Sequence, residues 1–339
     1  MAAKPRVYVT RHLPGGALDY LGQYTSLEWW LGELPPSRDE LIKQAASCYG
    51  LLTLLTDRVD EELLDRAPRL LVVSNMATGF DNIDVAAASR RAVLVTRTPG
   101  VLSETTAEFT LALMFAAARR VVEGDRMTRA GEWRTWGPEI LLGQDLAGST
   151  LGIVGMGGIG AEVARRARTL GMQVVYHSRT RKPALERKYR MEFVELEDLL
   201  GEADFVSLHA PLTPEARHLI DERALRIMKR SAVLVNTARG PLVDQAALYD
   251  ALKAGEIAAA ALDVTDPEPV DPNDPLLSLP NVIITPHIAS ASVATRSRMA
   301  MLAAENLVEA LNGNVPKHAV NREIVREWRA RLKQTEAHS

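Results

Sequence analysis

The sequence predicts an α/β fold with two domains, each built on a parallel sheet. Three observations lead to this prediction. The chain has 339 residues, more than one ordinary hydrophobic core encloses, and 47% of them are hydrophobic. Short apolar runs typical of strands alternate with helical patterns, as they do in parallel sheets. A glycine-rich turn near the middle of the chain then opens a second series of the same kind.

The first series occupies roughly the first 100 residues. Apolar, β-branched runs predict strands at 6–10, 27–30, 50–55, 70–74 and 92–96, with helices at 17–23 and 60–67. Ser37 precedes Glu40 by three residues, which is the spacing of a capping box at a helix start. A helix at 103–124 follows and is apolar on most faces, so we expect it to be buried between domains or subunits.

The second series has the same character. It predicts strands at 151–154, 173–176, 205–208, 232–236, 258–264 and 282–285, and helices at 161–167, 197–200 and 293–312. The tail from Glu327 is rich in charged residues, which favours a solvated helix or a frayed end. The stretch 131–138 carries Trp133 and Trp136 without periodicity. It is either an interface arm or a locally buried loop.

Composition excludes several classes of function. The net charge of −3 gives no electrostatic reason to expect a nucleic acid or a membrane surface as partner. The single cysteine, Cys48, excludes an intramolecular disulfide and a cysteine-based metal cluster, and we interpret it as a small buried side chain. The first five residues lack the apolar core of a signal peptide, and no run is long enough to span a bilayer. We therefore expect a cytoplasmic protein without a metal.

The glycine-rich turn has the pattern G-x-G-x-x-G between a predicted strand and a predicted helix. Its residues are Gly155, Met156, Gly157, Gly158, Ile159 and Gly160. In this context the first glycine allows a sharp turn, the second allows a pyrophosphate to approach the backbone, and the third allows close packing of helix on strand. The helix N-terminus then offers unpaired N–H groups to the phosphates. The pattern predicts a dinucleotide site, and the alternative is a merely tight turn.

The strand after this turn indicates which dinucleotide binds. A site for NAD usually carries an acid there, on the ribose 2′-hydroxyl. Residues 176–182 contain no acid and instead offer Ser178, Arg179 and Thr180, followed by Arg181 and Lys182. Guanidinium and hydroxyl donors suit a 2′-phosphate. We therefore predict NADP(H), with NAD(H) as the alternative if the turn is only a solvated basic one.

Three polar residues follow predicted strands of the second series, namely Arg239, Glu268 and His287. Hydride addition to a ketone develops negative charge on oxygen, and a histidinium can donate the proton that neutralises it. A carboxylate on the far ring nitrogen orients an imidazole and favours its charged form. A guanidinium can bind a substrate carboxylate and polarise the carbonyl. Each residue alone has an ordinary structural explanation, but the three together behind a dinucleotide turn indicate catalysis.

A loop at 75–84 follows a strand of the first series. Its small residues leave backbone N–H groups for an anion, at the sheet edge where ligands bind in this architecture. Asp81 and Asn82 can equally cap a helix that starts near Val85. Both interpretations stay open from the sequence alone.

Taken together, these motifs resemble the D-isomer-specific 2-hydroxyacid dehydrogenase family, and within it the glyoxylate/hydroxypyruvate reductases. The matching segments extend through nearly the whole chain: Thr78–Asp84, Gly155–Gly160, Asn236–Gly240, Leu262–Val264, Pro267–Pro269 and Thr285–Ile288. The resemblance implies two Rossmann-like parallel-sheet domains, with the cofactor domain inserted in a flavodoxin-like substrate domain. It places the substrate domain at 1–101 and 288–339, and the NADP(H) domain at 102–287.

The resemblance also implies roles for residues. His287 is the acid/base, Glu268 its partner and Arg239 the substrate anchor, while Asp263 contacts the nicotinamide carboxamide. Ala77, Thr78 and Gly79 hold the substrate carboxylate beside Arg239 and His287, and Thr237, Ala238, Arg239 and His287 lie along the cofactor. Members are typically homodimers, with the helix after Pro99 and the tryptophan-bearing loop in the interface.

The chain departs from the family pattern at two places. Thr265-Asp266 stands where an aromatic and an acid are common, a form familiar from animal-type glyoxylate/hydroxypyruvate reductases, and Ala289 stands where glycine is common. Neither change removes a chemical group. The expected activity is NADPH-preferring reduction of glyoxylate and hydroxypyruvate. The alternatives are another 2-hydroxyacid or phosphite dehydrogenase of the family, or a dinucleotide-sensing corepressor-like protein.

Overall fold

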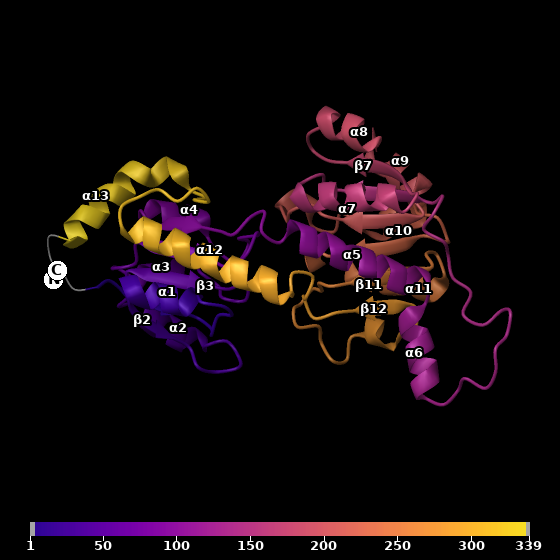
Figure 1. The fold of residues 1–339 in the computed structure, drawn as a ribbon, viewed down its shortest axis with the longest axis horizontal. Helices are drawn as coiled ribbons and strands as arrows, with labels where there is room; N and C mark the ends of the chain where they lie inside the picture. Colours follow the sequence, from indigo (N-terminus) through magenta and orange to yellow (C-terminus); the bar gives the residue numbers. More distant parts are fainter. Residues whose placement is uncertain (1–3, 337–339) are drawn as a thin grey trace. The chain divides into compact units, whose positions relative to one another are not determined.

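The computed structural model describes residues 4–336, which group into two units. Unit 1 combines the residues up to Leu102 with those from Ala291 onward, and unit 2 is Ser103–Ser290. The chain thus forms most of unit 1, then all of unit 2, and returns to complete unit 1. Figure 1 shows this order by colour, with the yellow C-terminal helices beside the indigo N-terminal elements.

Unit 1 contains a parallel sheet in the order β2-β1-β3-β4-β5. Its strands are β1 (Arg6–Val9), β2 (Ser26–Trp29), β3 (Gly50–Thr53), β4 (Val72–Asn75) and β5 (Leu94–Thr96). The strand order 2-1-3-4-5 is that of flavodoxin-like folds, and it reverses direction between β1 and β3. The predicted fold class for this part of the chain is confirmed.

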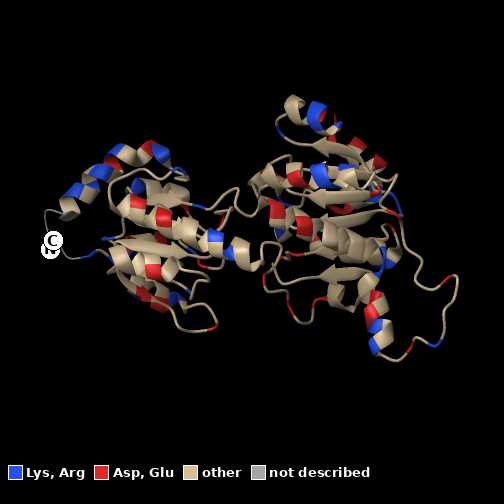
Figure 2. Cartoon of the chain, viewed as in Figure 1, with Lys and Arg blue, Asp and Glu red and all other residues tan. Residues whose placement is uncertain are grey.

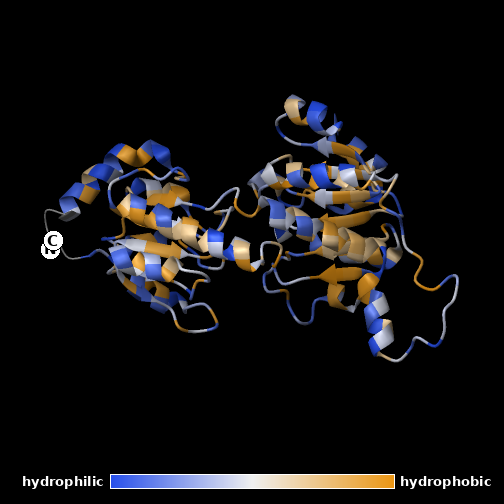
Figure 3. Cartoon of the chain, in the orientation of Figure 1, coloured by the Kyte–Doolittle hydropathy of each residue, from blue (hydrophilic) through white to orange (hydrophobic). Residues whose placement is uncertain are grey.

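Helices cover both faces of this sheet, and three of its strands are fully buried as a result. All residues of β3, β4 and β5 are buried, which is typical of parallel strands covered from two sides. Figure 3 shows these strands in orange between helices with mixed colours. The helices of unit 1 are α1 (Ala17–Tyr24), α2 (Arg38–Ala45), α3 (Glu61–Asp65), α4 (Val85–Arg90), α12 (Val293–Leu311) and α13 (Val325–Glu336).

The caps of two helices differ in how well the sequence predicts them. Ser37 caps α2 by accepting a hydrogen bond from the backbone N–H of Glu40, as expected from the spacing. The cap of α4 is Asp84, which accepts from Ala87, so the predicted capping by Asp81 and Asn82 is wrong.

Cys48 is fully buried, as predicted, and burial raises the pKa of its thiol to about 11.

The C-terminal tail is part of the core of unit 1. Trp328 of α13 is 0% exposed and Leu332 is also buried. Asn321, just before this helix, accepts a hydrogen bond from the backbone of Val95 and donates to the carbonyl of Val93. The predicted helix is therefore confirmed, but it is anchored by Trp328 rather than wholly solvated or frayed, and residues 337–339 lie outside the described residues.

Unit 2 contains a larger parallel sheet in the order β12-β11-β10-β9-β6-β7-β8. Its strands are β6 (Thr150–Val154), β7 (Gln173–His177), β8 (Glu192–Phe193), β9 (Phe205–Leu208), β10 (Val233–Asn236), β11 (Ala259–Leu262) and β12 (Val282–Ile284). Neighbouring strands all run parallel. The strand order reverses between β6 and β9, which is where open α/β sheets bind their ligands.

The helices and loops of unit 2 carry the charged side chains, and the strands carry almost none (Figure 2). These helices are α5 (Ser103–Ala118), α6 (Val121–Arg129), α7 (Gly158–Thr169), α8 (Pro183–Tyr189), α9 (Leu196–Glu202), α10 (Glu222–Ile227) and α11 (Gln245–Ala254). Within the described residues, no helix is long and apolar enough to cross a membrane.

The single helix expected at 103–124 is two helices. Arg120 adopts a left-handed conformation with φ 52° between α5 and α6. The carbonyl of Ala118, which a continuing helix would pair internally, instead accepts a hydrogen bond from the backbone of Gln144. Gly143 makes this approach possible, because an ideal Cβ there would lie 2.2 Å from the Ala118 carbonyl oxygen. The returning chain thus ends the helix.

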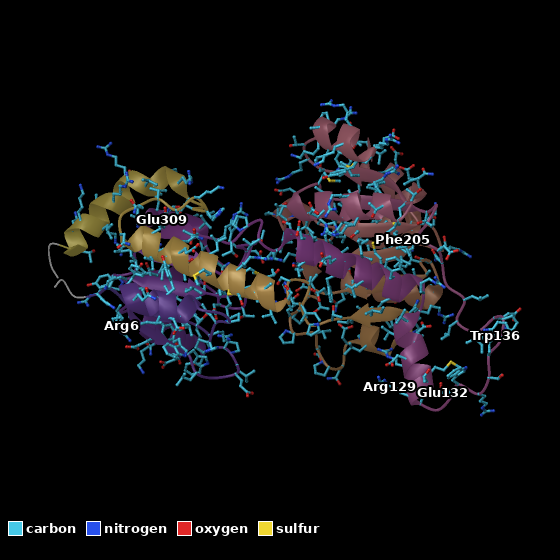
Figure 4. All side chains as sticks on the ribbon, in the orientation of Figure 1. Arg6, Arg129, Glu132, Trp136, Phe205 and Glu309 are labelled. Atoms are coloured by element: carbon cyan, nitrogen blue, oxygen red, sulfur yellow. The ribbon has the colours of Figure 1, made fainter. Side chains whose placement is uncertain are left out.

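The segment between α6 and β6 forms an exposed arm, defined here as residues 131–145. It has no regular secondary structure, and Trp133 and Trp136 are 61% and 79% exposed. Figure 4 labels Trp136 on this arm, far from the sheet of unit 2. A locally buried loop, one of the two interpretations left open by the sequence, is thereby excluded within this chain.

Replacing Trp328 by alanine tests whether the tail anchors unit 1. We expect the free energy of unfolding, measured by urea denaturation, to fall by about 3–5 kcal/mol, as is typical when a large buried aromatic is removed. Lys333→Ala on the exposed side of the same helix is the control and should change it by less than about 0.5 kcal/mol. Equal effects of the two substitutions would contradict the anchoring role.

Candidate active site

Three adjacent strands of unit 2 bring the predicted polar residues to one edge of the sheet. In the parallel register, Asn236 at the end of β10 pairs with Leu262 at the end of β11, which pairs with Ile284 of β12. Arg239 follows β10, Glu268 follows β11 and His287 follows β12. The loops that carry these residues therefore leave the sheet side by side.

His287 and Glu268 form a direct pair. The Nδ1 atom of His287 lies 2.9 Å from Oε2 of Glu268, and the two side chains are 24% and 32% exposed. The second carboxylate oxygen of Glu268 accepts a hydrogen bond from the backbone of Thr265 at 3.2 Å. Glu268 is thus fixed at one oxygen and orients the imidazole with the other.

A buried carboxylate holds the turn that presents His287. Asp263 is 1% exposed, and it accepts hydrogen bonds from the Thr285 hydroxyl (2.6 Å) and from the backbone of Ile288 (2.9 Å) and Ala289 (2.7 Å). Its own carbonyl accepts from the backbone N–H of His287 at 2.9 Å. His287 has φ 55°, a conformation that costs energy for a residue with a side chain. The bonds to Asp263 stabilise it.

The Arg239 loop is fixed in two ways. The side chain of Asn236 donates to the carbonyl of Arg239 at 2.8 Å and accepts from the backbone of Ala238 at 3.0 Å. Gly240 lies against the following loop, because an ideal Cβ there would come within 1.9 Å of the Thr265 carbonyl oxygen. Only glycine allows this approach, which joins the loop of Arg239 to that of Glu268.

The glycine turn is built as a phosphate cradle at the reversal point of the sheet. Gly155 has φ 101°, and an ideal Cβ at Gly160 would lie 2.3 Å from the Gly155 carbonyl oxygen, so the first and third glycines are required. The space around an ideal Cβ at Gly157 is empty to 4 Å, and no side chain caps the N-terminus of α7. Met156 and Ile159 pack into the core, so they contribute only their backbone.

A partly exposed histidine lies across this reversal point at the end of β9. The backbone of His209 donates to Val154, and its ring Nε2 lies 2.8 Å from the Ser207 hydroxyl. Burial lowers the pKa of His209 to about 3, so the ring is neutral, although the residue as a whole is partly exposed. Its Nδ1 atom is buried without a partner in the described chain. An orphaned polar atom beside an open glycine and an uncapped helix fits a dinucleotide.

The acid-free turn after β7 contains one available guanidinium. Arg181 makes a two-bond ion pair with Glu186, at 2.9 Å on each oxygen, and the Ser178 hydroxyl donates to the Thr180 carbonyl. Arg179 is exposed and makes no hydrogen bond or ion pair with any described residue. Of the two arginines in this turn, Arg179 is therefore the one whose guanidinium is left for a ligand.

Thr237 and Ala238, expected along the cofactor, are engaged with the protein. Thr237 is buried and its hydroxyl lies 2.9 Å from that of Thr110 on α5. The backbone N–H of Ala238 already donates to Asn236. These two residues hold the loop in place through contacts within the protein. Arg239 is the residue of this segment with a long polar side chain.

The predicted substrate loop lies in unit 1, after β4. Ala77 is buried, whereas Thr78 and Gly79 are partly exposed. The backbone N–H groups of Thr78 and Gly79 have no acceptor among residues 4–336. Beside this loop, at the reversal point of the unit 1 sheet, lies a cavity of ≈ 540 Å³ whose lining includes Arg11, Leu54 and Met76.

Sequence reasoning missed the residues that support the site rather than form it. These are Asn236, Thr285 in its contact with Asp263, and Gln245, whose side chain accepts from the backbone of Asp266 and donates to Asp274. The only sequence feature that could have indicated these supporting residues is an amide or hydroxyl side chain at the end of a strand or helix. No group of acidic, histidine or cysteine side chains within residues 4–336 is arranged to hold a metal ion.

Comparison with known proteins agrees with this geometry. Residues 111–289 match the family model of the D-isomer specific 2-hydroxyacid dehydrogenase, NAD binding domain. Glyoxylate reductases of Korarchaeum cryptofilum and Aeropyrum pernix are 53% and 54% identical, each aligned over 95% of this chain and 98% of the relative. The crystal structure of the TT0316 protein from Thermus thermophilus has 52% identity and a TM-score of 0.87, covering 93% of this chain and 99% of that one.

Similar structures with a bound cofactor are also known. One of them is an NADPH-dependent glyoxylate/hydroxypyruvate reductase from Sinorhizobium meliloti in complex with NADP and malonate, with 30% identity and a TM-score of 0.82 over 94% of this chain and 97% of that chain. Membership of one enzyme family therefore explains the fold, the glycine turn and the polar residues at the strand ends. The chain belongs to the D-isomer-specific 2-hydroxyacid dehydrogenase family of oxidoreductases and binds a nicotinamide dinucleotide.

Proposed function

We propose that the protein reduces short 2-oxo acids, glyoxylate and hydroxypyruvate among them, with NADPH as the preferred reductant. The pair of His287 and Glu268 beside the Arg239 loop carries this proposal. The names of the archaeal relatives support glyoxylate, and that of the Sinorhizobium meliloti relative supports hydroxypyruvate and NADPH.

The bound reduced nicotinamide would supply the hydride to the carbonyl carbon. The developing charge on the carbonyl oxygen needs a proton, and His287 donates it. Because Nδ1 of His287 faces Glu268, the proton leaves from Nε2. Glu268 keeps the ring oriented through its hydrogen bond to Nδ1. Arg239 binds the substrate carboxylate and polarises the carbonyl. Asp263 holds the His287 turn, and its carboxylate has capacity left for the nicotinamide carboxamide.

Substrate recognition would also use unit 1. The N–H groups of Thr78 and Gly79 suit a carboxylate, because consecutive unpaired backbone donors attract anions. The cavity of ≈ 540 Å³ beside them supports acids larger than glyoxylate, such as hydroxypyruvate. The proposed domains are therefore a discontinuous substrate domain, at about 1–101 and 288–339, and a cofactor domain at about 102–287.

A substrate series tests the proposed activity. NADPH and NADH oxidation would be followed with glyoxylate, hydroxypyruvate and pyruvate under identical conditions. We expect turnover with glyoxylate and hydroxypyruvate and a higher kcat/KM with NADPH. A protein that turns over none of the three acids would refute the proposed function.

Replacing His287 by alanine removes the general acid. We expect kcat for glyoxylate to fall by roughly 10²- to 10⁴-fold, the usual contribution of a positioned acid. The dissociation constant of NADPH should stay within about twofold, because the phosphate cradle is intact. His218→Ala is a matched control, since His218 is in the same unit, has φ 53° and lies 3.6 Å from Asp244. If His287→Ala keeps full turnover, the assignment of the acid is wrong.

Replacing Arg179 by alanine tests the cofactor preference. A lost charge-assisted hydrogen bond to a 2′-phosphate should raise KM for NADPH by roughly tenfold or more, whereas KM for NADH should not change. Arg181→Ala is the control, because Arg181 is engaged with Glu186. Equal KM values for NADPH in the wild type and the Arg179 variant would exclude Arg179 as the 2′-phosphate ligand.

We also propose that the protein acts in the cytoplasm as a homodimer in which the exposed arm packs on a second copy. Trp133, Trp136 and Leu142 on the arm are 61%, 79% and 66% exposed, and such apolar side chains in one segment are typical of interfaces. Sedimentation analysis should give twice the chain mass for the wild type. Trp136→Ser should shift the equilibrium toward the single chain, and a monomeric wild type would overturn the proposal.

A further inference from the structure

A buried asparagine and a half-buried one connect the ends of two strands of unit 1. Asn75, the last residue of β4, is 0% exposed, and its side-chain amide donates to Oδ1 of Asn82 at 3.1 Å. The amide of Asn82 in turn donates to the carbonyls of Leu54 (3.1 Å) and Asp57 (2.8 Å), which follow β3. The pair therefore ties the predicted substrate loop to the neighbouring strand end.

The orientation of the Asn75 side chain follows from its partners. Its nitrogen also donates to the carbonyl of Gly79 at 3.1 Å, while its oxygen accepts from the Thr53 hydroxyl at 3.0 Å. Turning the amide over would place its oxygen against the Gly79 carbonyl, which repels it. Asn75 thus acts as a donor toward the loop, and no residue type of similar size supplies two such donors without a charge.

This bond to Gly79 is one of three that fix consecutive carbonyls of the loop. The carbonyl of Ala77 accepts from the backbone of Thr98 at 2.8 Å, and that of Thr78 accepts from the Arg97 guanidinium at 3.1 Å. The third is the carbonyl of Gly79, held by Asn75. The protein therefore pairs the oxygen side of three successive peptide groups.

The N–H groups of the same peptides are the groups left for a ligand. In a trans peptide the N–H points opposite to the carbonyl. Pairing the carbonyls of residues 77–79 therefore directs the N–H groups of Thr78, Gly79 and Phe80 away from the atoms that hold them. None of the three has an acceptor within the described chain. A row of such donors binds an anion.

We propose that Asn75 is a positioning residue for substrate binding: by holding the Gly79 carbonyl and Asn82, it fixes the backbone donors that receive the substrate carboxylate. This inference rests on the proposed function of the loop. Asn75 is buried and acts through the backbone, so it affects binding of the acid rather than transfer of the hydride. Its partner Asn82 also fixes Leu54, which lines the adjacent cavity.

Kinetics of Asn75→Ala test the proposal. We expect KM for glyoxylate to rise about tenfold, as for a charge-assisted hydrogen bond weakened by poor geometry, with kcat and KM for NADPH changed less than about twofold. Asn321→Ala is the matched control. Asn321 is 1% exposed in the same unit, and its amide also makes several hydrogen bonds, but these hold β5 near Val93 and Val95.

The outcomes separate a positioning role from a structural one. If Asn321→Ala raises KM for glyoxylate as much as Asn75→Ala does, the effect is general destabilisation and the proposal is overturned. It is also overturned if Asn75→Ala leaves KM unchanged or lowers kcat instead. A rise in KM confined to Asn75→Ala supports it.

A binding measurement keeps the test independent of turnover. Malonate, a dicarboxylate that cannot be reduced, would be titrated calorimetrically into the NADPH-loaded protein. We expect its dissociation constant to rise about tenfold in Asn75→Ala and to stay unchanged in Asn321→Ala. A wild type that reduces no 2-oxo acid would refute the proposed function and leave this comparison valid. Equal malonate affinity in all three proteins, or no binding by the wild type, would overturn the role of Asn75.

Discussion

The site in unit 2 depends on one buried carboxylate. Asp263 lies at the end of β11 and accepts three hydrogen bonds from the segment that follows β12. A buried charge is costly unless such donors compensate it, and here one side-chain hydroxyl before His287 and two backbone N–H groups after it do so. Two unfavourable features therefore compensate each other. The N–H and O–H groups of the turn stabilise the buried carboxylate of Asp263, and the carboxylate in turn stabilises the left-handed backbone of His287. Removing either would release the other.

The residues to which we assign the chemistry could be proposed from the sequence, and those that hold them in place could not. Arg239, Glu268 and His287 follow apolar runs, and in a parallel sheet such positions share one edge whatever the details of packing. The roles of Gly155, Gly157 and Gly160 could also be predicted, because the spacing of these glycines reflects the local backbone conformation. This is why the fold class and the family resemblance were correct.

The supporting contacts depend on pairs that are distant in sequence. From the sequence, Arg181 is a candidate phosphate ligand, but in the structure it pairs with Glu186 on the next helix. Trp328 looked like one apolar residue in a charged tail, yet it completes the core of unit 1. Asn82 looked like a helix cap, whereas it bonds to a neighbouring strand end. Each of these outcomes depends on which partner lies within about 3 Å, the length of a hydrogen bond or close contact, and the local sequence does not encode that.

The discontinuity of unit 1 has a consequence for how the chain is made. Helix α12 packs on β3, β4 and β5, and α13 adds Trp328, yet both helices are synthesised only after all of unit 2. The first five strands are therefore synthesised with one apolar face uncovered and remain so while all of unit 2 emerges. Unit 2 is continuous and can complete its core first, since domains generally fold as units during synthesis. The unit that begins second is thus the first whose residues have all been synthesised.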